Sequence, residues 1–120
     1  MGKKTMVIGA TTNQGRYAFF AVKELLYHGH DVIPIGIKKG NIFGMQIING
    51  LPQIQDIHTI TLYVGPKNQE NYIDYIFELN PKRIIFNPGS ENDKLIKQAL
   101  LNDIEVIIDC TLMMLSNGEY

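Results

Sequence analysis

The chain has 120 residues, of which 45% are apolar and 19% are charged, with 11 glycines and 5 prolines. This is the composition of one globular domain spanning residues 1–120, and it excludes disordered, collagen-like and disulfide-scaffold proteins. Eleven basic residues against twelve acidic ones leave a formal net charge of −1, so the strong positive field of most nucleic-acid-binding domains is missing. No apolar run approaches the roughly 20 residues that span a bilayer, and Cys110 has no second cysteine to pair with. We therefore expect a cytoplasmic domain that binds neither nucleic acid nor membrane.

The first third of the chain alternates between two periodicities. Met6–Ile8 is a continuous apolar run closed by a glycine, which predicts a buried strand. The apolar residues of Ala18–Leu26 fall on one helical face, and Gly29 stands where a helix C-terminus needs a positive φ. Val32–Ile35 predicts a second strand, and Pro34, which lacks an amide hydrogen, belongs near its end.

Residues 38–57 keep no single period. They contain three glycines and Pro52, so we expect a long, mostly irregular connection with a short helical turn after Pro52. Regular patterns return with Ile60–Val64, a β-rich run ended by a Gly-Pro pair. Tyr72–Phe77 then predicts a helix that stops before Pro81.

Two more strands and two more helices complete the pattern. Arg83–Phe86 and Glu105–Ile108 are predicted strands. Ser90 is the expected N-cap of a helix between them. The inner face of that helix is expected to hold Leu95, Ile96, Ala99 and Leu100. After the last strand, Leu112–Leu115 predicts a short helix that either covers the sheet edge or forms a homodimer contact.

Alternating strands and helices, with strands that are apolar throughout, indicate a parallel sheet covered by helices on both faces. Right-handed crossovers between parallel strands restrict the topology further. The sequence therefore predicts an α/β fold: a single Rossmann-like, doubly wound sheet of five parallel strands. Ligands of such sheets bind beyond the carboxyl ends of the strands, at the point where the strand order reverses.

The turn after the first strand, residues 9–17, suits a phosphate group. It has glycines near both ends, two threonine hydroxyls between them, and a helix that begins directly behind it. Free amides and the positive end of the helix dipole favour an anion there, although the same glycines also serve a purely structural turn. The candidate residues are Gly9, Ala10, Thr11, Thr12, Asn13, Gly15, Arg16 and Tyr17.

Two named phosphate motifs do not fit this turn. In a P-loop the two glycines are closer by one residue and Lys follows them, whereas Arg16 follows here. The dinucleotide fingerprint needs its second glycine where Thr11 stands. The second strand also ends without the acidic residue of an NAD site. Lys38 and Lys39 follow it, and they either suit a phosphorylated ribose, as in coenzyme A (CoA) or NADP, or form a solvated surface.

Several features stand in a fixed order along the chain. They are the Gly9-x-Thr11 turn with Gly15, the run Val32–Ile35 leading to Lys38, Gly44, the exit Asn87-Pro88-Gly89 and the exit Asp109-Cys110. This ordered set resembles the small CoA-binding domain proteins, which are similar to the N-terminal domain of the succinyl-CoA synthetase α subunit. The resemblance runs from Thr5 to about Leu115. One difference is Gly36-Ile37-Lys38, where many relatives have Asn-Pro-Lys.

The resemblance implies a Rossmann-like fold that binds the nucleotide end of CoA. It places the pyrophosphate at residues 10–16 and a phosphate at Lys38, with Val64, Gly65 and Pro66 along the adenosine or pantetheine path. The strand exits add Asn87, Pro88, Gly89 and Cys110 to the cofactor-binding set. Succinyl-CoA ligase chemistry needs a further domain with a phosphorylated histidine and a β subunit, so we do not expect that reaction from these residues.

No catalytic set is assembled in the sequence. His28 and His30 flank a helix end, and His58 precedes a strand, away from the expected cleft; neither place supplies further metal donors. Cys110 follows the last strand and suits a small buried position better than thiol exchange, because no base stands nearby. Ser90 has no His-Asp partnership and is better explained as a helix cap than as a nucleophile.

We therefore expect the function to be non-catalytic binding of CoA or an acyl-CoA, a small-molecule nucleotide cofactor, with no metal. An atypical NADP-binding oxidoreductase is the first alternative, since the same turn and lysine would serve it. An interaction subunit with a vestigial nucleotide cleft, acting through an unknown protein partner, is the second.

Overall fold

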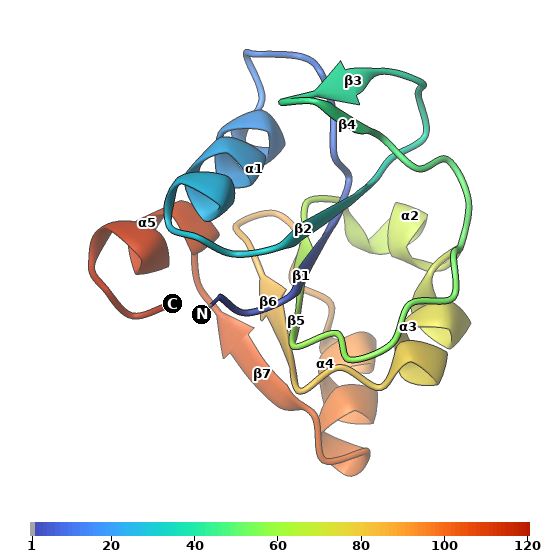
Figure 1. Ribbon diagram of the computed structural model, residues 1–120. Helices are drawn as coiled ribbons and strands as arrows, with labels where there is room; N and C mark the ends of the chain where they lie inside the picture. The colour runs from blue at the N-terminus through green and yellow to red at the C-terminus, as the bar shows by residue number, and fades with distance from the viewer. Residues whose placement is uncertain (1) are drawn as a thin grey trace.

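Five parallel strands form the central sheet, in the order β2-β1-β5-β6-β7 (Figure 1). They are seen in a computed structural model that describes residues 2–120. The strands are β1 (Thr5–Ile8), β2 (Val32–Ile35), β5 (Thr59–Leu62), β6 (Arg83–Phe86) and β7 (Glu105–Ile108). Every neighbouring pair is parallel and in continuous register, so the predicted Rossmann-like sheet is confirmed.

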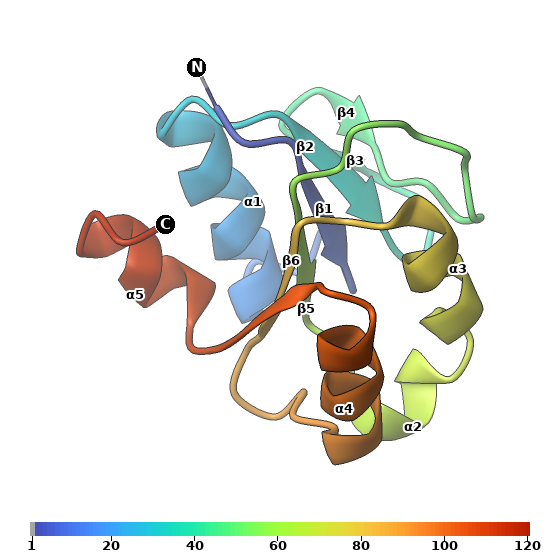
Figure 2. The ribbon, with the colours of Figure 1, turned by 90° about the horizontal axis from the view of Figure 1, so that it is seen from below.

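Helices cover both faces of this sheet, as Figure 2 shows. On one face lie α1 (Tyr17–Tyr27) and α5 (Thr111–Ser116). On the other lie α2 (Pro66–Gln69), α3 (Ile73–Leu79) and α4 (Asp93–Leu101). Among residues 2–120, no helix is long and apolar enough to cross a membrane.

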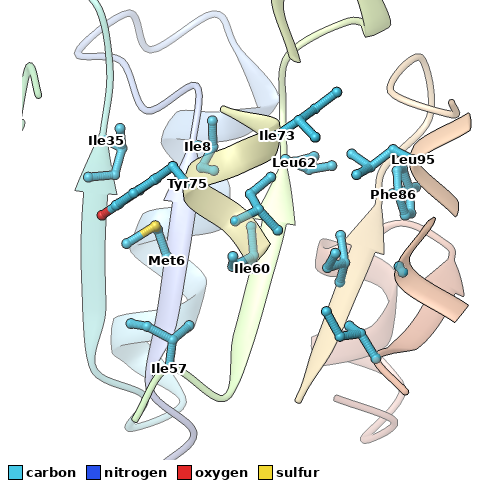
Figure 3. Packing of buried hydrophobic residues seen from close by; sticks show 14 residues of the cluster. Met6, Ile8, Ile35, Ile57, Ile60, Leu62, Ile73, Tyr75, Phe86 and Leu95 are labelled. Atoms are coloured by element: carbon cyan, nitrogen blue, oxygen red, sulfur yellow. The ribbon is translucent and has the colours of Figure 1, made fainter. Parts of the chain in front are cut away.

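The two faces of the sheet carry different side chains, because successive residues of a strand point to opposite sides. The face under α3 and α4 is apolar, and its buried strand residues include Ile84 and those labelled in Figure 3: Met6, Ile8, Ile35, Ile60, Leu62 and Phe86. On the face under α1 and α5, Val7 packs against Val22 and Leu115. Buried threonines and Arg83 occupy the alternate positions of the same strands, and the buried Asn87 directly follows β6.

The first βαβ unit forms as the sequence predicts. In α1 the buried residues are Ala18, Ala21, Val22 and Leu25, and after the helix Gly29 takes a φ of +83°. Pro34 lies in β2, which is an edge strand. Its carbonyl points away from β1 and accepts a hydrogen bond from the Ile48 amide at 2.9 Å. The nitrogen of Pro34 points to the same outer side, so its missing amide hydrogen costs no hydrogen bond to β1.

The connection over residues 38–57 is more regular than predicted. It contains a small antiparallel hairpin of β3 (Asn41–Ile42) and β4 (Met45–Gln46). The two residues of its turn, Phe43 and Gly44, both have positive φ, which matches the twist of a tight hairpin. The predicted helical turn after Pro52 is wrong, because residues 52–56 form no helix.

Helix α4 differs from its prediction in two respects. Its N-cap is Asn92, whose Oδ1 accepts from the Leu95 amide, while the Ser90 hydroxyl donates to the Asn87 carbonyl at 2.7 Å. Ser90 is therefore not the cap. Leu100 is 59% exposed rather than inward-facing, because it lies well over a quarter turn around the helix from the buried Leu95.

Candidate functional site

A cleft of about 800 Å³ opens at the carboxyl ends of β1, β2, β5 and β6. The chain leaves β1 toward one edge of the sheet and leaves β5 toward the other, and the cleft lies over this reversal. Many of the sequence-predicted residues line it: Gly9, Ala10, Thr11, Thr12, Asn13, Gly15, Arg16, Tyr17, Lys38, Val64, Gly65, Pro88 and Gly89.

Two glycines bring the walls of the cleft together. Gly9 has a φ of +102°, and a Cβ atom there would lie 2.8 Å from the carbonyl oxygen of Tyr63. A Cβ atom at Gly36 would lie 2.4 Å from the carbonyl oxygen of Ala10. Since neither position has room for a side chain, the backbone itself forms this part of the cleft wall.

The β1–α1 turn is held by its own side chains. The Asn13 amide donates to Thr11 Oγ1 at 3.1 Å, and the Gly15 amide donates to Asn13 Oδ1 at 2.9 Å. Arg16, the N-cap of α1, is extended and makes no side-chain cap. The Phe19 amide donates to the Arg16 carbonyl, which leaves the first two amides of α1, at Tyr17 and Ala18, for an anion. The Thr11 hydroxyl, which accepts one bond, still has a proton to donate.

The charges at the cleft are of one sign. Arg16 and Lys38 are exposed and line it, whereas no Asp or Glu among residues 2–120 does. The loop that carries Lys38 is fixed by Asn49, whose Nδ2 donates to the carbonyls of Gly36 (2.8 Å) and Lys38 (3.0 Å). Cations beside uncapped amides attract a polyanion. Asn49 had no signal in the sequence, because it lies in the stretch without a period.

The second half of the cleft is polar but uncharged. It is formed by Asn68, Asn71, Tyr72 and Ser90, which follow β5 and β6. Behind them the buried Gln69 donates from Nε2 to the carbonyls of Val64 (2.9 Å) and Ser90 (2.7 Å), and so ties the two loops together. The sequence could have indicated Asn68 and Asn71, because they come soon after a predicted strand. The same criterion selected residues 9–17.

Three predicted site residues do not line the cleft: Pro66, Asn87 and Cys110. Pro66 is the first residue of α2, and Cys110 lies half-buried just before α5. Asn87 is buried, where its Nδ2 donates to Thr61 Oγ1 (2.6 Å) and its Oδ1 accepts from the Thr111 amide (2.8 Å). These bonds join β5, β6 and α5, and so position the loop that follows β6 at the cleft.

Two tyrosines at the cleft differ in environment. Tyr17 is 76% exposed at the start of α1. The Tyr63 hydroxyl is buried, and burial raises the pKa of this phenol, so it stays protonated at neutral pH. Within the described part of the chain, residues 2–120, no group of three His, Cys, Asp or Glu side chains could hold a metal ion. The cleft thus offers amides, hydroxyls and cations, which suit the holding of an anion.

The fold and the cleft define an α/β domain of the Rossmann-like class, with a cleft at its switch point. The family model described as CoA binding domain matches residues 3–116, and the chain belongs to this family. The family predicted from the sequence is thereby confirmed. No curated protein matches the chain.

Solved structures share the fold. One, a crystal structure of an uncharacterized protein, is 48% identical with a TM-score of 0.98, and the match covers 100% of this chain and 99% of that one. A hypothetical protein from Pyrococcus horikoshii OT3 is 24% identical with a TM-score of 0.86, over 98% of this chain and 83% of that one. The dinucleotide-forming acetyl-coenzyme A synthetase 1 of Ca. Korarchaeum cryptofilum, in complex with phosphate and ADP, is 14% identical with a TM-score of 0.73. That match covers 90% of this chain and 26% of the synthetase.

Proposed function

We propose that this chain binds CoA or an acyl-CoA and does not itself turn it over. Membership of the CoA-binding domain family supports CoA as the ligand in general. The observation that carries the proposal is the cleft, where the uncapped amides of α1, Arg16 and Lys38 come together and no acidic residue among residues 2–120 intervenes.

In the proposed complex the phosphates of CoA meet the cationic half of the cleft. The pyrophosphate lies against residues 10–16, where the α1 amides and the Thr11 hydroxyl donate to it. The phosphate on the ribose lies near Lys38. The uncharged part of the ligand then follows Val64 and Gly65 toward Asn68 and Asn71, whose amides suit neutral groups.

Isothermal titration with CoA, acetyl-CoA and dephospho-CoA tests this arrangement. Dephospho-CoA, which lacks the ribose phosphate, should bind roughly three to ten times more weakly than CoA, the effect of one exposed charge-assisted contact. Lys38→Gln should weaken CoA by the same factor and leave dephospho-CoA unchanged. Lys39→Gln is the matched control, because this neighbouring lysine does not line the cleft. No binding of CoA or acetyl-CoA at millimolar concentration overturns the proposal.

NADP is the second candidate, because it shares a pyrophosphate and a phosphorylated ribose with CoA. Lys38 and the missing acidic residue at the end of β2 suit either molecule. Tighter binding of NADPH than of CoA in the same titration would assign the cleft to an oxidoreductase. If no nucleotide binds or raises the melting temperature, the cleft is vestigial and the chain acts through a protein partner.

A further inference from the structure

A second group of basic side chains lies at the opposite end of the sheet from the cleft. There the first residues of β1, β5 and β6 stand side by side in one row, with Thr5 beside Thr59 and Thr59 beside Arg83. Arg83 is only 5% exposed, although an arginine is seldom buried without an acidic partner. Its Nε donates to Thr59 Oγ1 at 2.7 Å.

The Arg83 guanidinium has an unused donor. Its Nη2 is buried and has no hydrogen-bond partner among residues 2–120. Glu105 is the next residue in the row, on β7, but it is exposed and does not bond to Nη2. A buried guanidinium without an anion is unfavourable, and an apolar side chain of similar size would avoid the cost. The charge at this position therefore suggests a use.

Further basic side chains surround Arg83. His58 Nδ1 lies 2.7 Å from the same Thr59 hydroxyl, which accepts from Arg83 and so has its own proton free for the histidine. The Lys3 amide donates to His30 Nδ1 at 2.8 Å. Burial, followed by the charges of Arg83 and Lys3, lowers the pKa of His58. Lys3, His30, His58 and Arg83 together are called the basic cluster below.

Tyr120 covers the basic cluster. Its ring centre lies 4.4 Å from the guanidinium carbon of Arg83, 4.7 Å from the ring centre of His30 and 5.9 Å from Lys3 Nζ. Its hydroxyl is hydrogen-bonded to that of Thr5. Residues 117–120, which bring the ring there, follow α5 and belong to no strand, so the ring can leave without breaking the sheet.

We propose that the basic cluster is a second binding site, for a small oxyanion such as a phosphate or carboxylate group, and that the Tyr120 ring covers the site when it is empty. The bound anion accepts from Nη2 of Arg83 and lies between the guanidinium and His58. Without it, the tyrosine ring stabilises the guanidinium by cation–π attraction. This site is independent of the proposed CoA site, because the two lie at opposite ends of the same strands.

Nuclear magnetic resonance titrations at constant pH, with inorganic phosphate and separately with acetate, test the second site. The ring signals of His58 and His30 report on the basic cluster alone, because no histidine among residues 2–120 lines the cleft. Phosphate or acetate should shift both signals in a saturable way, and Arg83→Met should abolish the shift. Tyr120→Ala should tighten anion binding about threefold or more, because the ring no longer competes.

Two controls separate the second site from general charge effects and from misfolding. Lys94→Gln removes an exposed cation from α4 and should leave the histidine shifts unchanged. Unchanged CoA affinity, or an unchanged melting curve if CoA does not bind, shows that Arg83→Met is folded. A shift that survives in Arg83→Met, or that is absent from the unmodified chain with both anions, overturns the site. Equal anion affinity in Tyr120→Ala overturns the covering role of Tyr120.

Discussion

Both ends of the central sheet carry positively charged side chains, but these are exposed at one end and include a buried arginine at the other. At the carboxyl ends, Arg16 and Lys38 stand exposed over uncapped amides in an open cleft. At the amino ends, Arg83 is buried beneath Tyr120, with a threonine hydroxyl as its partner. Packing makes the difference, because the backbone itself forms the cleft wall at Gly9, whereas the Tyr120 ring covers the other end. An anion therefore reaches the carboxyl ends of the strands, called the open end below, without displacing a side chain. At the amino ends, called the closed end, it must displace the Tyr120 ring.

Gly9→Ala acts on the open end and has the largest expected effect. The alanine must adopt a φ of +102°, with its Cβ only 2.8 Å from the Tyr63 carbonyl oxygen. We expect the free energy of unfolding, measured by urea denaturation, to fall by about 2–4 kcal/mol, and CoA binding to be lost. Gly44→Ala is the matched control, since its φ is +82° but nothing lies within 4 Å of the added Cβ.

The control should cost about 1 kcal/mol, the strain of the positive φ alone. Equal losses for Gly9→Ala and Gly44→Ala would contradict the idea that close approach of backbone segments shapes the open end.

Asn87→Ala tests whether polar groups beneath α5 support the open end or bind the ligand. The change removes the side-chain amide, so the Thr111 amide loses its hydrogen-bond partner and Thr61 keeps only its hydrogen bond to the Thr111 hydroxyl. We expect a loss of about 2–3 kcal/mol in the free energy of unfolding, with CoA affinity nearly unchanged. Asn117→Ala, at an exposed amide, should stay within about 0.5 kcal/mol of the parent chain. Weaker CoA binding without a loss of stability would instead make Asn87 a ligand contact.

Much of the open end could be predicted because one rule about parallel sheets selects the segments after each strand. That rule found residues 9–17 and Lys38, all on the chain just beyond β1 and β2. It could not separate Asn87 from Pro88, which follow the same strand. Asn87 turns inward to Thr61, while Pro88 lines the cleft. The direction of a side chain depends on its neighbours in space, which the sequence does not display.

The closed end had no signal of its own. Its residues are scattered along the chain, and none belongs to a recognisable sequence motif: Lys3, His30, His58, Arg83 and Tyr120. Only the register of the strands brings Arg83 to Thr59 and Thr5, and only the return of the chain after α5 brings Tyr120 over them.

The β3–β4 hairpin was missed for a different reason. Strands of two residues are too short to show a period, and the first turn position holds Phe43 instead of the usual Asn, Asp or Gly. Gly44 at the second turn position was the one available signal.

Acidification acts on the closed end and has the smallest expected effect. Burial is the main cause that lowers the pKa of both His30 and His58 below 6.5. The charges that face them add to this shift: Lys3, His28, Arg83 and His58 act on His30, and Arg83, Lys3 and Lys82 act on His58, where Glu105 opposes them. Both rings therefore take up a proton at a lower pH in the folded chain than in the unfolded chain.

The sign of the pH effect follows from these lowered pKa values. Well above pH 6.5 both histidines are neutral in the folded and unfolded chains, so they add no pH dependence there. Below it the unfolded chain binds protons first, and the free energy of unfolding falls until the folded histidines are protonated too. Urea denaturation between about pH 6.5 and 5, above the range where most carboxyl groups titrate, should show this decline.

The double variant His30→Gln with His58→Gln should flatten that decline, because glutamine keeps an acceptor for the Lys3 amide but takes up no proton. His28→Gln, at an exposed ring that contributes less than burial and Lys3 to the lowered pKa of His30, is the matched control and should keep most of the slope. Phosphate bound at the basic cluster should also reduce the slope, because an anion favours the charged histidines. A double variant that loses stability as steeply as the parent chain would mean that the lowered pKa values of these rings do not cause the decline. The closed end would then differ from the open one in burial alone.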